Sequence, residues 1–97
     1  MQDEELLIHK LNLETSLIPW VELQRQFAAG RAIVISKTLD LLITAQTFSE
    51  DNSNQVKQWI ESEKLQAASD DQAKNWIKTN AELWAIVVSP WVLVQET

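Results

Sequence analysis

The amino-acid sequence predicts an α/β (α+β) fold, in which a small sheet of about three strands is covered by amphipathic helices. Three observations predict it. A β-branched run covers Ala32–Ile35, residues 83–94 are apolar apart from Ser89 and Pro90, and several other segments carry apolar residues at helical spacing. The 97 residues suffice for one hydrophobic core but not for separate catalytic and substrate domains, so residues 1–97 are expected to form a single compact domain.

The N-terminal segment is expected to form a first helix. Leu7, Ile8 and Leu11 recur at helical spacing, and Asp3 can cap a helix that runs to about Leu17.

A second helix is expected to begin at Pro19, because proline suits the first helical position and restricts the residue before it. Trp20, Leu23 and Phe27 would form its apolar stripe. Gly30 stands where a left-handed C-terminal cap belongs. The two helices would form a hairpin, and the run Ala32–Ile35 that follows is typical of a strand buried on both faces.

Residues 38–48 (TLDLLITAQTF) fit two patterns. Leu39, Leu42 and Ile43 have helical spacing, whereas Leu39, Leu41, Ile43 and Ala45 alternate as in a strand. Periodicity alone does not decide between them. We interpret the segment as a helix, because Thr38 can cap its start.

The next segments are predicted to be a helix, a short strand and a helix. Ser53 would open the first helix, and residues 65–68 would form the strand. The residues from Ser69 to Gln72 have the form of a capping box, in which the side chains of both residues accept hydrogen bonds from each other's backbone N–H groups. That box would open a helix that Asn80 can close.

Residues 83–95 are expected to form one long strand bent at Pro90. A two-residue hairpin at Ser89 and Pro90 is not expected, because the favoured hairpin turns need positive φ and proline cannot adopt it. Both faces of this strand are apolar, so its distal half is covered either by the chain's own helices or by a partner. One or two of the five Trp should keep an exposed edge, and Trp91 is the candidate. The candidate interface comprises Trp84, Pro90, Trp91, Val92 and Val94.

Charge and composition exclude several classes of partner. The net charge is −6 and the eight Lys and Arg are scattered, so no cationic surface for nucleic acid or an anionic membrane is expected. Cysteine is absent, which excludes disulfides and thiolate chemistry. The N-terminus is acidic, unlike that of a secretory signal, and no apolar run approaches the roughly 20 residues that span a bilayer. A cytoplasmic location is expected.

Catalytic chemistry has little support in the residue pattern, and we expect no cofactor and no metal. His9 is the only histidine and is expected to face solvent. Asp40 is the more interesting acidic residue, because it follows a strand-to-helix connection, where α/β sheets tend to bind ligands. A helix-start role for Asp40 is the favoured alternative. The candidate ligand site groups Asp40 with Glu14, Thr15 and Arg31.

Four stretches together resemble a small bacterial family catalogued as domain of unknown function 2288. They are LNLETSLIPWVELQRQFAAG, TLDLL, DDQAKNW and the C-terminal ELWAIVVSPWVLVQE, and the likeness extends from Leu11 to Glu96. One departure is Pro19, where a small polar residue is expected before Trp20. The resemblance implies a free-standing, single-domain bacterial protein and supplies no catalytic or binding residues.

The sequence therefore favours a non-catalytic protein that acts by association, as a homodimer formed through the last strand. The alternative is a small-molecule-binding or metal-dependent enzyme domain that uses Asp40 at the end of the sheet.

Overall fold

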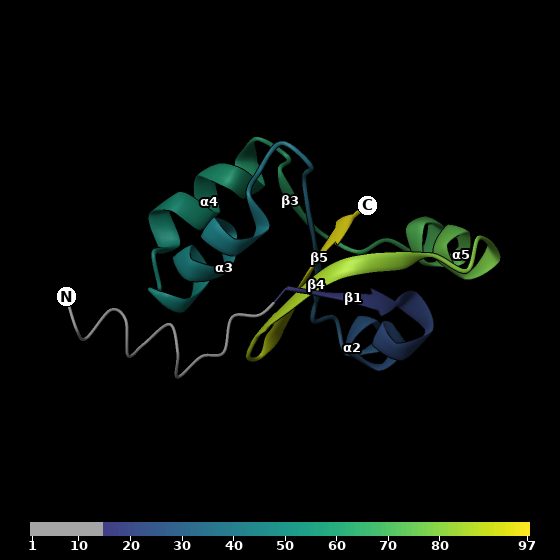
Figure 1. The fold of residues 1–97 in the computed structure, drawn as a ribbon. Coiled ribbons are helices and arrows are strands. Elements are labelled where there is room, and N and C mark those ends of the chain that lie inside the picture. Colours follow the sequence, from purple (N-terminus) through teal and green to yellow (C-terminus); the bar gives the residue numbers. More distant parts are fainter. Residues whose placement is uncertain (1–14) are drawn as a thin grey trace.

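A five-stranded sheet runs through the middle of the molecule (Figure 1). The computed structural model describes residues 15–97, and within them the strand order is β1-β4-β5-β2-β3. The strands are β1 (Ser16–Pro19), β2 (Ala32–Ile35), β3 (Leu65–Ala67), β4 (Glu82–Val88) and β5 (Trp91–Glu96). The central strand β5 pairs in parallel with β2 and antiparallel with β4, and the other two pairings are antiparallel.

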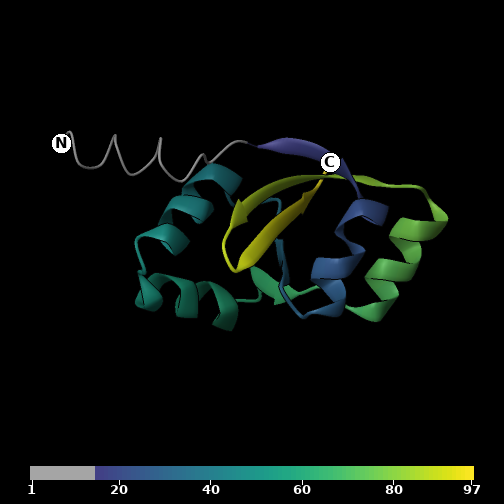
Figure 2. The same cartoon turned by 90° about the horizontal axis from the view of Figure 1, so that it is seen from below.

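Helices cover both faces of this sheet (Figure 2). The 3₁₀ helix η1 (Trp20–Leu23), α2 (Gln24–Ala28) and α5 (Asp70–Lys78) lie on one face, and α3 (Leu41–Ser49) and α4 (Ser53–Glu61) lie on the other. The described residues thus form a single compact α+β domain with three layers. Five strands are present rather than about three, because one strand lies where a helix was predicted and the last predicted strand is two strands.

The core consists of two clusters, one on each face of the sheet. On the first face, the indole rings of Trp20 and Trp76 lie 4.7 Å apart between ring centroids and join η1 to α5. Val92 and Val94 of β5 pack against this group. On the second face, Leu93 packs with residues of α3, β2, β3 and β4, among them Leu41, Ala45, Ile35, Leu65 and Ile86. Successive β5 side chains therefore supply both clusters, as alternation along a strand requires.

The prediction of a single long C-terminal strand is wrong. Residues 82–96 form an antiparallel hairpin of β4 and β5, in which Val88 pairs with Trp91 across a turn at Ser89 and Pro90. Turns with positive φ are not the only ones that can connect two antiparallel strands. Neither Ser89 nor Pro90 has positive φ, and the peptide bond between them is cis. The four residues 88–91 thus form the kind of β-turn that has a cis proline at its third position.

The predicted first helix is contradicted at its C-terminal end, where Ser16–Pro19 is strand β1. Leu17 and Ile18 pair with Trp84 and Leu83 of β4, so long-range sheet pairing prevails over the helical spacing of the sequence. The rest of that predicted helix lies outside the described residues. Pro19 ends β1 and immediately precedes η1, so the helical segment begins one residue later than predicted, and no helical hairpin forms at Pro19.

Most of the elements predicted from short sequence patterns are present in the structure. Gly30 has φ +74° just after α2, and Ala32–Ile35 is a strand. The capping box of Ser69 and Gln72 opens α5. Residues 41–49 are helical, but Asp40 caps that helix and Thr38 does not: the Asp40 carboxylate accepts from the Ile43 N–H at 3.0 Å.

Gln95 fixes the end of β5 to the loop that leads into α3. Its side-chain amide donates to the backbone carbonyls of Ser36 and Leu39, each at 2.9 Å. Both bonds are partly buried and join residues more than 50 positions apart in the sequence. This amide therefore holds the start of α3 against the sheet.

Replacing Gln95 with Ala is expected to lower the free energy of unfolding by about 2 kcal/mol, because two partly buried carbonyls lose their donor. Gln58, whose side chain is exposed on α4, provides the control, and Gln58→Ala should change stability by less than about 0.5 kcal/mol. Urea unfolding followed by circular dichroism measures both values. Equal stability of the two variants would show that the Gln95 amide contributes nothing.

Candidate functional site

The helices α3 and α4 leave apolar side chains uncovered at two ends of the sheet face on which they pack. At one end, Leu17, Leu42 and Trp84 are 42%, 42% and 40% exposed. Leu17 pairs with Trp84 across the sheet, and Leu42 of α3 lines the same shallow depression as Trp84. These three residues are called the Trp84 patch below.

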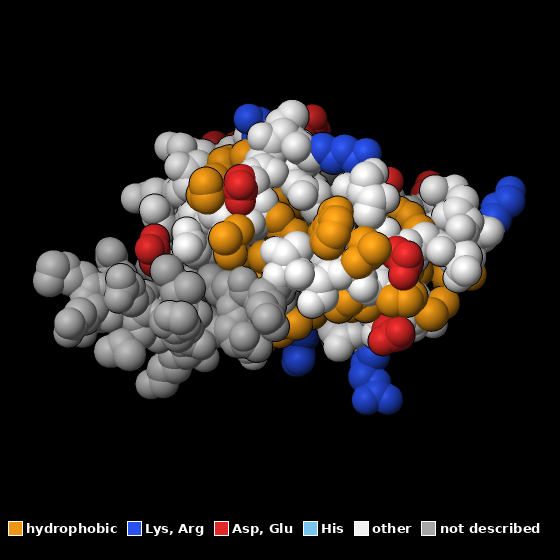
Figure 3. Space-filling view, viewed as in Figure 1, with side chains coloured by type: hydrophobic (Ala, Val, Ile, Leu, Met, Phe, Trp, Pro, Cys, Tyr) orange, Lys and Arg blue, Asp and Glu red, His pale blue; other side chains and the backbone are white. Residues whose placement is uncertain are grey.

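Apolar side chains extend across the middle of the molecular face shown in Figure 3, whereas Lys and Arg side chains lie at its margins. Apolar groups gathered on one face in this way are typical of a contact region.

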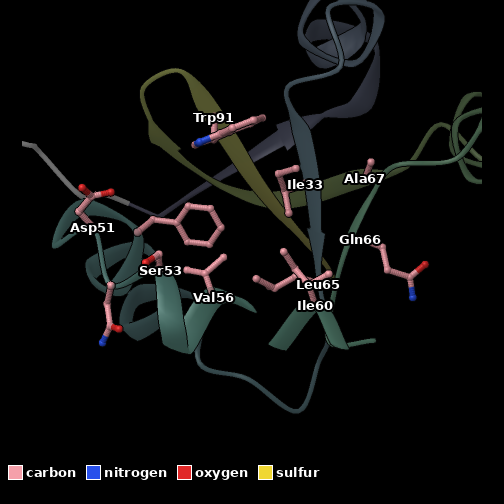
Figure 4. A pocket seen from close by; sticks show the side chains of 11 residues that line it. Ile33, Asp51, Ser53, Val56, Ile60, Leu65, Gln66, Ala67 and Trp91 are labelled. Carbon is pink, nitrogen blue, oxygen red and sulfur yellow. The ribbon is translucent and has the colours of Figure 1, made fainter. Parts of the chain in front are cut away.

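The other end of the sheet face borders a pocket of about 390 Å³. Its walls come from β2, α3, α4, β3 and β5 and are mostly apolar: Ile33, Phe48, Val56, Ile60, Leu65 and Trp91, with Ala67 at the margin. Trp91, which is 37% exposed, lies across the pocket from Val56 and Leu65 (Figure 4). We call this cavity the Trp91 pocket. Its volume and its apolar lining are those of a small binding pocket.

Polar groups line the Trp91 pocket mainly at the turn between α3 and α4. Asp51 adopts a left-handed conformation with φ 59° in this turn. Asn52 caps α4 by accepting from the Gln55 N–H, and Ser53 is the first helical residue. Gln66 also lines the pocket, but its side chain points away from the cavity (Figure 4). Asp51 is thus the only charged side chain among the described residues that line the pocket.

The structure divides the predicted interface among three places. Trp84 belongs to the Trp84 patch, while Pro90 is exposed at the tip of the hairpin beside Trp91. Trp84 pairs with Gln95, which lies four positions from Trp91 along β5, a distance of roughly 13 Å. Val92 and Val94 lie in the core, so the folded chain does not present them to a partner. The expectation that Trp91 keeps an exposed edge is confirmed.

Neither strand of the C-terminal hairpin has a free edge. Both strands of the hairpin are internal, because β4 lies between β1 and β5 and β5 lies between β4 and β2. The edges of the sheet are β1 and β3.

The predicted ligand site is only partly assembled. Thr15 and Asp40 lie together in the depression beside Trp84, but Arg31 precedes β2 and Asp40 follows it. The length of that strand separates them, roughly 16 Å between residues 31 and 36. Glu14 lies outside the described residues. The favoured alternative, a helix-start role for Asp40, is confirmed by its hydrogen bond to Ile43.

Residues 15–97 contain neither a metal-binding cluster nor a helix that could span a membrane. The described part of the chain contains no group of three or more His, Asp or Glu side chains arranged to hold a metal ion. None of its helices has the length and hydrophobicity that crossing a bilayer would require.

The sequence did not reveal the Trp91 pocket. Phe48, Val56 and Ile60 have the spacing of helix faces that pack on a core, and nothing in that spacing shows where such a face extends beyond the sheet. One available signal was the run of three polar turn residues, Asp51, Asn52 and Ser53, between two helices that each have an apolar face. Such residues can provide polar groups at the mouth of a cavity.

Comparison with known proteins agrees with the fold. The solution structure of PA1075 from Pseudomonas aeruginosa is similar, with 38% sequence identity and a TM-score of 0.81, over 93% of this chain and 83% of that chain. No relative was found among curated proteins. The family model for DUF2288, a protein of unknown function, matches residues 6–96. The chain therefore belongs to the DUF2288 family.

Proposed function

We propose that this domain is a non-catalytic cytoplasmic protein that acts by self-association, as a homodimer formed through the Trp84 patch. The observation that carries the proposal is the exposure of three large apolar side chains from three different elements, β1, β4 and α3, at one place. Apolar side chains exposed singly are normal on a protein surface, whereas a contiguous group marks a contact region.

A second copy is a suitable occupant because a patch of this kind is complementary to itself. Around a two-fold axis, the same residues of both copies meet. Trp84 would supply the large rigid side chain that interface centres favour. A stable interface buries about 800 Å² on each partner, so the Trp84 patch would form its centre and the neighbouring residues of α3 and β1 its rim.

We expect Trp84→Glu to convert a dimer into a folded monomer, because a buried carboxylate at the centre of the interface would lack a partner. Trp91→Glu is the matched control: it makes the same change on the same sheet face, at the turn end of the β4–β5 hairpin. Light scattering measures the mass in solution, and circular dichroism verifies that both variants fold. A monomeric natural chain, or a dimer that only Trp91→Glu dissociates, would contradict the proposal.

The alternative function, an enzyme or small-molecule site at Asp40, has weaker support. One carboxylate oxygen of Asp40 already accepts a backbone N–H, and the residue that would add a positive charge, Arg31, lies at the far end of β2. Only Thr15 of its three predicted neighbours lies beside it in the described structure. The capping bond accounts for the acidic residue at this position.

If capping is the role of Asp40, Asp40→Ala should lower the free energy of unfolding by about 1 kcal/mol, whereas Asp40→Asn should retain nearly all of it. Asparagine keeps the side-chain oxygen that accepts from Ile43, and alanine removes it. Thermal unfolding of the two variants gives the comparison. A natural chain no more stable than Asp40→Ala would remove the capping explanation and return Asp40 to the candidate ligand groups.

A further inference from the structure

The Trp91 pocket is elongated along the helix α4. Ser53, Val56 and Ile60 are spaced three and four positions apart, so their side chains form one row on the helix surface, and all three line the pocket. From Ser53 to Ile60 the helix rises about 10 Å. The row begins at the turn between α3 and α4 and ends near β3, which follows α4 in the chain. A ligand that fills this pocket therefore lies lengthwise along α4.

The long walls of the pocket are apolar. Besides the α4 side chains, they include Ile33, Leu65 and Trp91, which come from three strands of the sheet (Figure 4). Leu65 is buried and belongs to the floor, whereas Ile60 and Trp91 are 56% and 37% exposed. The pocket thus opens to solvent beside Ile60 and Trp91, and a ligand reaches it without pairing with the backbone of β3. An apolar chain of the right length would be removed from water along these walls.

The polar end of the pocket lies at the turn between α3 and α4. Asp51 carries the only charge among the described residues that line the pocket, and Ser53 adds a hydroxyl oxygen. No Lys, Arg or His is among these lining residues. Carboxylate and hydroxyl oxygens accept hydrogen bonds from an ammonium group, whereas Asp51 and the net charge of −6 repel an anionic group. The pocket therefore combines apolar walls with an end that favours a cation.

We propose that the Trp91 pocket binds a small linear alkyl amine. The alkyl chain lies along Val56 and Ile60 against Trp91, and the ammonium group at the turn between α3 and α4 pairs with Asp51. An extended chain of single bonds advances about 1.2 Å per bond, so roughly eight carbons span the rise from Ile60 to Ser53. A much shorter amine buries its chain or reaches the carboxylate, but not both. The site is separate from the Trp84 patch and does not depend on the proposed dimer.

Chain length provides the first test. The natural chain is titrated with butylamine, hexylamine, octylamine and dodecylamine, and the indole N–H of Trp91 is followed by NMR. The indole N–H of Trp76, buried on the opposite sheet face, is the internal control and should not shift. Affinity should rise about 2- to 4-fold with each added CH2 up to roughly eight carbons and then level off. An unshifted Trp91 signal, or affinity that rises equally steeply to dodecylamine, would overturn the proposal.

The head group provides the second test, because octylamine, 1-octanol and octanoate carry a cationic, a neutral and an anionic group. Octylamine should bind about 3-fold more tightly than 1-octanol and about 10-fold more tightly than octanoate. Asp51→Asn should remove most of both preferences. Asp71→Asn, the same change at an exposed position on α5, should keep them. If 1-octanol or octanoate binds the natural chain as tightly as octylamine, the proposed occupant is wrong.

Two isoleucines provide a matched test of the walls. Ile60 and Ile77 are each the eighth residue of a nine-residue helix and are 56% and 48% exposed, but only Ile60 lines the Trp91 pocket. Ile60→Ser should weaken octylamine binding about 5-fold and Ile77→Ser less than about 2-fold. Circular dichroism verifies that both variants fold. Equal effects of the two substitutions would show that octylamine binds elsewhere and would refute the site.

The outcome for this pocket is independent of the outcome for the homodimer. Trp84→Glu should bind octylamine with the Kd of the natural chain, whether or not the substitution alters the mass in solution. A monomeric natural chain that binds octylamine through Asp51 and Ile60 would refute only the dimer. A dimer that does not bind octylamine would refute only the amine site.

Discussion

The architecture depends on one strand that has no polar face. Val92, Leu93 and Val94 follow one another along β5 and are all buried. Because neighbouring side chains of a strand point to opposite faces, neither face of β5 can be exposed to water without losing apolar burial. Strands β4 and β2 therefore flank it, and helices cover it from both sides. The two core clusters, the three layers and the internal position of the hairpin all follow from this requirement.

The possible binding surfaces follow from how little area the helices can cover. Each of α3 and α4 has nine residues, a length of about 14 Å, whereas the seven residues of β4 extend for roughly 23 Å. The middle of the sheet face is buried beneath Leu41 and Ala45, whereas Trp84 and Trp91, at its two ends, are 40% and 37% exposed. Trp84 lies at one end and Trp91 at the other, so the two exposed Trp belong to two different surfaces.

Local signals predicted their elements because the interactions that produce them lie within a few residues. The capping box at Ser69 and the left-handed Gly30 are examples, since both bring backbone groups close in the sequence into contact. The same holds for the hydrogen bond from Ile43 to Asp40. At the candidate sites, the sequence predicted an exposed edge of Trp91 but also assigned Val92 and Val94 to the contact surface. Alternation shows which residues share a face, and it does not show which face a helix will cover.

The sequence by itself determined the α+β class, the position of β2, the helices after residue 40 and the need to cover both faces of the last apolar stretch. Only the tertiary structure decided that Ser16–Pro19 is a strand and that the C-terminal stretch folds back on itself at Ser89 and Pro90. It also brought Phe48, Leu65 and Trp91 together around one pocket. The physical reason is that strand pairing and cavity formation join residues far apart in the chain, and periodicity within a short window carries no information about such partners.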